Sequence, residues 1–352
     1  MRFSQASSVF RRTFLFGAVG VAICDVGCSN SLTDPPEEGK ARIVFDQLNA
    51  AILSVSGTAA DDIYAVGADP GDGLGPYVLH YNGQNWRRLE SGASGALWWI
   101  SVEMIGGSFY MAGTQGKVLR FTPADAEFEQ FLLPGEPTLF GVWGSSPDDL
   151  WAVGGDPDDE DMGGGVWRFD GTAWAAQDLS EAAPAGLPML YKVWGRDSND
   201  VYIVGRSGAA LHFDGEGWSR VICDTDRTLF TVHGNATQVV ASGGVGDAVI
   251  AELEEGKFVN HATAGTFQMN GVFIPPAGGG VTVGSKASVA FRTQSGWELQ
   301  DTGLESPRDL HAVWMDPDGG IWAVGGTLSA ALGNGIIIYI GEALVASDVI
   351  PN

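Results

Sequence analysis

Short apolar runs and glycine-rich turns alternate along residues 41–352. The clearest example is residues 139–154 (LFGVWGSSPDDLWAVG), where two nearly continuous apolar stretches flank a polar turn. Such runs predict strands that are buried on both faces. Apolar and polar residues partly alternate in residues 166–169 (VWRF), which predicts a third strand. Asp170-Gly171 favours a hairpin turn, and we expect a fourth strand to begin at Trp174. No helical pattern of about ten residues occurs in this part, which excludes α/β folds.

This four-strand pattern recurs along the chain, and its spacing predicts the architecture. Residues 52–67, 190–205 and 310–325 align with 139–154 without a gap, and weaker copies begin near residues 97, 229 and 269. Each copy closes on a glycine, namely Gly67, Gly113, Gly154, Gly205, Gly243, Gly284 and Gly325. Units of about 40 residues are typical of propellers. We therefore predict an all-β fold, a seven-bladed β-propeller of four-stranded antiparallel blades.

The predicted blades cover most of the chain, at about residues 52–90, 97–131, 139–179, 190–222, 229–262, 269–301 and 310–349. Residues 41–48 (ARIVFDQL) precede the first blade and predict a lone outer strand. We expect this strand to complete the last blade beside residues 335–340, because an open ring would leave unpaired backbone at its edge. The alternative is that residues 342–349 supply that strand and leave residues 41–48 outside.

The first 28 residues predict an export signal. Arg11-Arg12-Thr13-Phe14-Leu15 resembles the twin-arginine motif, and the apolar run at 13–24 is too short to span a bilayer. Val26-Gly27-Cys28 resembles the end of a bacterial lipobox, which implies lipidation of Cys28; the alternative is simple cleavage and secretion. Residues 29–40 predict a flexible tether. The resemblance to bacterial lipoproteins implies an exported protein at the outer membrane or in the periplasm, with the cell surface as a further location. The alternative is a secreted protein.

The charge balance excludes one class of partner. Lys and Arg number 19 against 43 Asp and Glu, a net charge of −24. Loss of the first 28 residues, which contain three Arg and one Asp, leaves about −26. A body this acidic repels the phosphate backbone, so we expect no nucleic-acid binding. Three cysteines exclude a disulfide-dense scaffold and a four-cysteine zinc site.

The D-G-x-x-W turn at 170–174 and the W-A-V-G strand at 151–154 resemble those of Asp-box, or BNR-like, propellers and of photosystem-assembly-factor-like repeats. The resemblance covers about residues 41–345. It implies the propeller fold, and it leaves the function open, because that family includes sialidases, receptors and assembly factors. No arginine cluster of the sialidase type occurs, so we predict that the protein is not an enzyme and assign no catalytic residues.

Features that occur in one blade only are the better functional candidates. Nine of the twelve Trp fall at repeat positions and predict core. Trp98 and Trp99 lie in a blade of altered spacing, where one spare Trp could stack on a sugar; the alternative is a displaced core Trp. His80 and His212 share one repeat position, which indicates structural use. Cys223 is the sole thiol of the body, and we expect it to be buried and inert.

The loop at 155–165 (GDPDDEDMGGG) is unique to the third blade. Its Asp156, Asp158, Asp159 and Asp161 are dense enough to ligate calcium, the one cofactor that we consider; the alternative is a solvated acidic loop. No other cofactor or metal is predicted.

Long connections are expected to gather on one face, namely at residues 68–76, 155–165, 180–188 and 326–335. A rigid scaffold with long loops on one side predicts a binding surface. We therefore predict a protein-interaction scaffold or binding module of the bacterial cell envelope. The expected partner is an envelope protein or a polysaccharide, the membrane is contacted through the N-terminal lipid only, and the chain is a monomer. The alternative is a carbohydrate-binding or glycan-active propeller.

Overall fold

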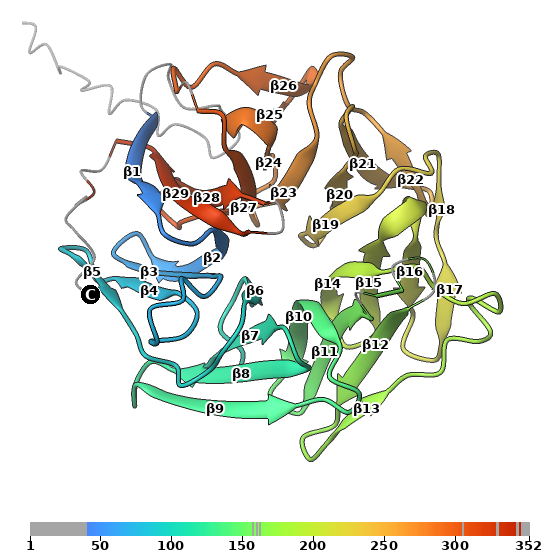
Figure 1. The fold of residues 1–352 in the computed structure, drawn as a ribbon. Helices are drawn as coiled ribbons and strands as arrows, with labels where there is room; N and C mark the ends of the chain where they lie inside the picture. Colours follow the sequence, from blue (N-terminus) through green and yellow to red (C-terminus); the bar gives the residue numbers. More distant parts are fainter. Residues whose placement is uncertain are drawn as a thin grey trace, which may run out of the picture. The chain divides into compact units, whose positions relative to one another are not determined.

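The structure, a computed structural model, describes residues 41–156, 158, 159, 161, 163–304, 306–328, 331–342 and 345. The predicted signal, Cys28 and the tether lie outside the described residues. Seven antiparallel sheets surround a central axis, as Figure 1 shows. The predicted all-β, seven-bladed propeller is therefore confirmed.

Each blade contributes one inner strand to the axis and one second strand behind it. The inner strands are β2 (Ile52–Ala59), β6 (Leu97–Ile100), β10 (Thr138–Ser146), β14 (Leu190–Asp197), β19 (Leu229–Gly234), β23 (Met269–Phe273) and β27 (Asp309–Met315). The second strands are β3 (Asp62–Gly67), β7 (Phe109–Gly113), β11 (Asp149–Gly155), β15 (Asp200–Gly205), β20 (Val239–Gly243), β24 (Val281–Gly284) and β28 (Ile321–Thr327).

Third and outer strands complete the blades. The third strands are β4 (Val78–Tyr81), β8 (Lys117–Thr122), β12 (Gly164–Phe169), β16 (Ala210–Phe213), β21 (Val249–Glu254), β25 (Val289–Thr293) and β29 (Gly333–Ile340). The outer strands are β5 (Trp86–Arg88), β9 (Glu127–Leu132), β13 (Trp174–Ala176), β17 (Trp218–Arg220), β22 (Lys257–Asn260), β26 (Gly296–Gln300) and β1 (Ala41–Leu48). Blade 5 adds a short fifth strand, β18 (Ile222–Cys223), parallel to β22.

The last blade contains strands from both ends of the described chain. β1 pairs antiparallel with β29, from Ala41 opposite Ile340 to Leu48 opposite Gly335. Asp46 of β1 also forms an ion pair with Arg308, 2.9 Å between Nη2 and Oδ1. The pairing satisfies the edge of β29 and ties the chain ends together, which removes the free edge that an open ring would expose.

Aromatic side chains fill the spaces between blades. Trp151 of β11 is fully buried and contacts Phe213 and Trp218 of the next blade, with ring centroids 5.1 and 5.2 Å apart. Trp322 of β28 contacts Trp86 of blade 1 in the same way, at 5.8 Å. Recurring Trp residues of second and outer strands thus pack one blade against the next. An aromatic side chain in a protein core buries about 150–250 Å² of surface.

The closing glycine of each repeat is required by a close backbone approach. A Cβ added at Gly154 would lie 2.0 Å from the carbonyl oxygen of Thr138, the residue that opens the inner strand. The corresponding Cβ in the other six blades would lie 1.9–2.4 Å from the equivalent carbonyl oxygen. The glycine therefore lets the second strand lie close to the start of the inner strand, which explains why this residue marks every repeat.

Candidate functional site

Every inner strand contains a bulge at the same place. In blade 3, Leu139 is opposite Gly154 and Gly141 is opposite Val153, which leaves Phe140 as the extra residue. The same register shift occurs in all seven blades, and the bulged residues are Leu53, Trp98, Phe140, Tyr191, Phe230, Asn270 and His311. A bulge re-aims its side chain, and bulges are frequent beside active sites. We call these seven residues the mouth collar.

The side chains of the mouth collar meet around the axis. Ring centroids of Trp98 and Phe140 lie 5.0 Å apart, those of Phe140 and Tyr191 5.4 Å, and those of Tyr191 and Phe230 5.7 Å. Trp98 of blade 2 also lies 6.0 Å from His311 of blade 7. Blades 7 and 2 are separated by blade 1, so this contact runs beside the axis. These five side chains are half-buried.

Side chains from neighbouring blades satisfy backbone carbonyls at the bulges. Lys192 donates from Nζ to the carbonyl oxygen of Phe140 at 2.9 Å. His311 donates from Nδ1 to the carbonyl oxygen of Leu53, and Asn270 donates from Nδ2 to that of Leu310 at 2.9 Å. A buried, unpaired carbonyl would cost about 1–3 kcal/mol. These bonds therefore fix the bulges and hold the mouth collar rigidly.

Lys192 and Trp99 lie one residue further along their inner strands and contact each other. Both residues are buried, at 3% and 8% exposure, and the Lys192 amine lies 3.4 Å from the centroid of the Trp99 ring. Burial holds the pKa of Lys192 well below its usual value. Burial and the positive charge of Lys192 lower the pKa of His311 to about 4, so its imidazole is neutral at pH 7.

Long connections lie at the same end of the blades as the mouth collar. In an antiparallel blade, the links from second to third strand and the links between blades leave from one end. Gly163 in the predicted acidic loop forms a bridge with Leu187 of the following link between blades. Ala51, before β2, donates its backbone N–H to Leu332 in the connection from β28 to β29. The loops thus border one another around this rim.

Trp98 and Trp99, the predicted stacking residues, have different surroundings. Trp98 belongs to the mouth collar and is half-buried. Trp99 is buried, and Lys192 occupies its ring face. Stacking on a ligand therefore remains a prediction for Trp98 only. The sequence alone did not single out Phe140, Tyr191 and Phe230, which align with Trp98 at one repeat position.

The four aspartates of the acidic loop do not converge in the described structure. No three of Asp156, Asp158, Asp159 and Asp161 form a group that could hold one ion, among the residues that the structure describes. The side chain of Asp156 accepts a hydrogen bond from the backbone N–H of Asp158, and Asp161 lies 3.2 Å from Arg206. Calcium binding by this loop stays a prediction.

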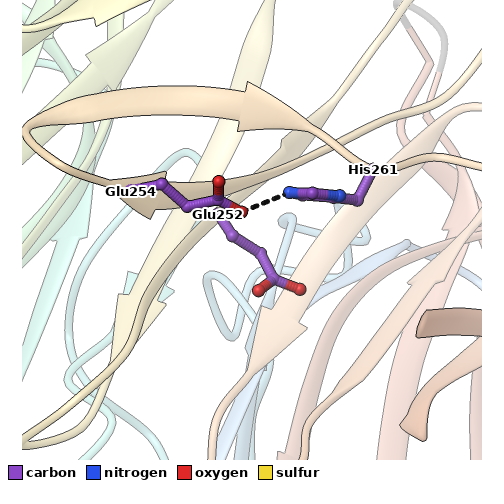
Figure 2. Close-up of side chains that lie close together, drawn as sticks. All are labelled: Glu252, Glu254 and His261. Atoms are coloured by element: carbon purple, nitrogen blue, oxygen red, sulfur yellow. Dashed lines mark hydrogen bonds and ion pairs between the residues drawn. The ribbon is translucent and has the colours of Figure 1, made fainter. Parts of the chain in front are cut away.

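A different group of metal-ligating side chains occurs on blade 5, shown in Figure 2. Glu252 and Glu254 of β21 and His261 after β22 place one ligand atom each within 4.8 Å of one another, the one such group in the described part of the chain. His261 Nε2 and Glu254 Oε1 lie 2.6 Å apart, and both side chains are exposed. Sequence inspection missed this group because its members come from two strands of a hairpin.

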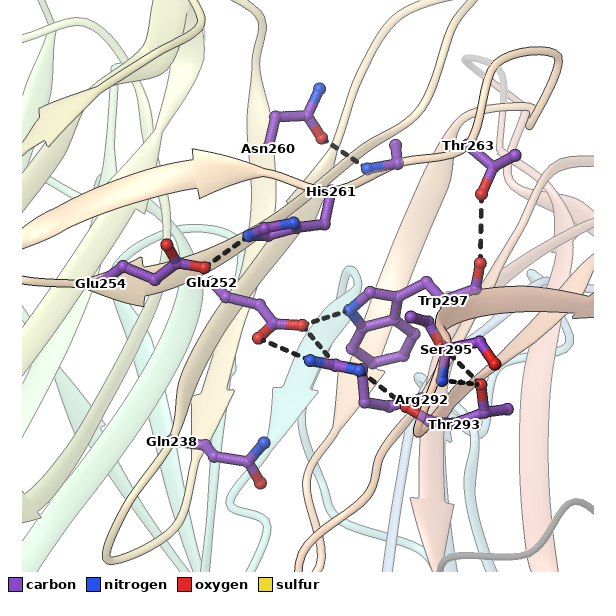
Figure 3. Close-up of polar contacts among 12 residues, drawn as sticks. Gln238, Glu252, Glu254, Asn260, His261, Thr263, Arg292, Thr293, Ser295 and Trp297 are labelled. Atoms are coloured by element: carbon purple, nitrogen blue, oxygen red, sulfur yellow. Dashed lines mark hydrogen bonds and ion pairs between the residues drawn. The ribbon is translucent and has the colours of Figure 1, made fainter.

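The contacts of Glu252 indicate a structural role (Figure 3). Arg292 donates from Nε to its Oε1 at 2.5 Å and from Nη2 to its Oε2 at 3.3 Å, and Trp297 donates from Nε1 to Oε1 at 2.8 Å. Arg292 and Trp297 belong to blade 6, so Glu252 joins two blades. A cation here would lie beside the Arg292 guanidinium, which makes the group a poor metal site.

His80 and His212 are also structural, as expected. His80 Nε2 lies 2.7 Å from Asp62 Oδ1, and its ring stacks on Tyr64 with centroids 4.4 Å apart. His212 makes the corresponding contact with Asp200, also at 2.7 Å. The pairs join second and third strands within blades 1 and 4. Their recurrence identifies them as part of the scaffold.

Comparison with solved structures agrees with the fold. The chain is similar to the WD40 β-propeller domain of Doa1 (TM-score 0.64, 9% identity, 86% of this chain and 97% of that one). It is also similar to streptogramin B lyase (TM-score 0.64, 10%, 86% and 99%) and to U3-55K (TM-score 0.62, 12%, 86% and 99%). These identities show a shared fold alone, and the fold includes both interaction domains and a lyase. No protein-family model and no curated protein matches the sequence.

The described residues contain no helix long and apolar enough to cross a membrane.

Proposed function

We propose that this protein is an exported binding module of the bacterial cell envelope. A rigid propeller presents the mouth collar and the surrounding loops to another envelope component. The observation that carries the proposal is the set of neighbouring, half-buried aromatic side chains on the bulges of blades 2 to 5. Aromatic groups that remain open to solvent on a rigid scaffold are typical of binding sites.

The proposal is of binding without catalysis. None of the seven residues of the mouth collar is acidic, whereas glycoside hydrolysis generally uses two carboxyl groups flanking the bond. Two features of the collar do favour the second candidate, a carbohydrate-binding role: the aromatic rings, and the polar residues Asn270 and His311 beside them.

Export and lipid anchoring at Cys28 rest on the sequence motifs of the first 28 residues. The test is mass spectrometry of the mature N-terminus. We expect a chain that begins with a diacylglyceryl-modified Cys28. A mature chain that begins at another residue, without lipid, would contradict anchoring and leave secretion as the route.

The binding role is tested by affinity capture from the native envelope with the full mature chain. Phe140→Leu removes an aromatic ring but keeps an apolar side chain, and blade 1 already carries Leu53 at the same position. The matched control is Leu299→Ser on β26, where the side chain is 52% exposed. We expect captured material to be lost with Phe140→Leu and kept with the control. Equal capture by all three proteins would contradict a binding site at the mouth collar.

A further inference from the structure

We infer that the mouth collar binds a sugar ring of a neutral glycan. The inference rests on the proposed function and deepens it, because it names the ligand class of the same site. Two properties of the collar carry it: an aromatic arc on blades 2 to 5 and a polar arc on blades 6 and 7.

The aromatic arc comprises Trp98, Phe140, Tyr191 and Phe230. Adjacent rings are tilted by 64°, 67° and 51°, so they follow one another around the axis edge to face. A sugar ring has an apolar face of C–H groups that packs on aromatic carbon. Because the arc extends over four consecutive blades, it offers such a face with curved, apolar walls.

The polar arc lies on the remaining blades and comprises Gln268, Asn270 and His311. Gln268 donates from Nε2 to Asn270 Oδ1 at 2.8 Å, and the buried Asn270 donates from Nδ2 to the carbonyl oxygen of Leu310, so Asn270 holds Gln268 in place. His311 uses Nδ1 to donate to the carbonyl oxygen of Leu53. Since this imidazole is neutral at pH 7, its Nε2 carries a lone pair that can accept a hydrogen bond from a hydroxyl group. An apolar side chain of a protein partner could not form hydrogen bonds with the polar arc.

The charges at the site favour an uncharged ligand. No carboxylate belongs to either arc, and the Lys192 amine bonds to the carbonyl oxygen of the collar residue Phe140, so a cationic ligand lacks a partner. An anionic glycan would approach a chain of net charge −24, which raises the cost of its encounter. A neutral sugar avoids both penalties.

Lys192 and Trp99 follow the collar residues Tyr191 and Trp98 in their strands, are buried, and contact each other. Because both are buried, a sugar ring would meet the half-buried collar residues and not these two.

The test is saturation-transfer NMR and titration of the full mature chain with maltose, cellobiose, lactose and diacetylchitobiose. Glucuronic acid and choline serve as charged probes. With about a dozen non-hydrogen atoms and roughly 0.3 kcal/mol per atom, one sugar ring gives a Kd of roughly 1 mM. We expect at least one neutral sugar to bind at this level, and both charged probes to bind at least about tenfold more weakly.

Two variants locate the site. Trp98→Leu and Phe230→Leu each remove one ring of the aromatic arc, and Leu53 shows that the bulge accepts leucine. Each should weaken sugar binding by about tenfold. Phe267→Leu, at a 45% exposed position outside the collar, is the matched control and should bind like the wild type. Thermal unfolding confirms that all three fold.

The inference is overturned if no neutral sugar binds, or if one binds equally well to both collar variants. Either result leaves the proposed function standing when Phe140→Leu still abolishes capture from the envelope. If no neutral sugar binds to the wild type and Phe140→Leu captures envelope material as well as the wild type does, both the sugar-binding inference and the proposed function are overturned.

Discussion

The amine of Lys192 lies on the ring face of Trp99, although the two residues belong to blades 4 and 2. Gly141 of blade 3 approaches the strand that contains this lysine. A Cβ at Gly141 would lie 3.2 Å from the Lys192 Cα and 3.2 Å from the Tyr191 carbonyl oxygen. The absence of a side chain at Gly141 thus lets the inner strand of blade 4 lie close to that of blade 3.

Lys192→Met should change how stability depends on pH. Burial lowers the pKa of Lys192 in the folded protein, so the unfolded chain binds more protons from that lowered pKa up to about 10.4. The free energy of unfolding therefore rises with pH between the lowered pKa of Lys192 and about 10.4. Denaturant unfolding between pH 7 and 10 should show a smaller rise for Lys192→Met than for the wild type. Equal slopes would contradict a desolvated amine at this position.

Gly154→Ala should destabilise the protein by about 1–3 kcal/mol, because the added methyl group collides with the Thr138 carbonyl oxygen. The control is Gly217→Ala, where the added methyl group would have no atom within 4 Å. Urea unfolding measures both. If the two variants lose the same stability, the close approach does not explain the closing glycine.

Glu252→Gln should destabilise the contact between blades 5 and 6 by about 1–3 kcal/mol, since Arg292 loses its charged partner. Glu254→Gln removes the same charge from an exposed pair with His261 and should cost less than about 1 kcal/mol. Urea unfolding of both variants tests the difference. A zinc-dependent rise in the melting temperature that both substitutions abolish would instead assign the group to metal binding.

Cys223 should react slowly with alkylating reagents. Cys223 is half-buried, where we expected full burial. This partial burial, together with the negative charge of Asp224, raises the pKa of its thiol to about 11. At pH 8 the thiolate fraction is then only about 0.001, and the thiolate is the reactive form. Iodoacetamide labelling, followed by mass spectrometry of the Cys223 peptide, should be roughly 100-fold slower in the native than in the unfolded protein. Comparable rates would show an accessible, reactive thiol.

The fold was predictable from the sequence because two residue types, an aromatic and a glycine, mark the repeat at fixed positions. The closing glycine recurs in all seven blades and reflects a close approach that every blade makes. An aromatic residue occupies the Trp151 position in five blades, and Val240 and Val281 occupy it in blades 5 and 6. For ring closure the sequence left two alternatives, and the structure pairs Ala41–Leu48 with β29.

The mouth collar was not predictable, for a physical reason. The inner strands are nearly continuous apolar runs in the sequence, so an inserted apolar residue such as Phe140 leaves that pattern unchanged. Only the register of hydrogen bonds reveals the bulge. Contacts across blades, such as Glu252 with Arg292, depend on blade packing and leave no spacing in the sequence.

The central claim is that the mouth collar is where this protein contacts its partner. The most direct measurement is photo-crosslinking in intact cells, with p-benzoylphenylalanine placed at Phe140 or, as the control, at Leu132. Leu132 is 62% exposed on the outer strand β9, so it meets solvent more freely than Phe140 does. The account predicts a discrete crosslinked product from position 140 and none from position 132. Crosslinking from position 132 alone, or from neither position, would contradict it.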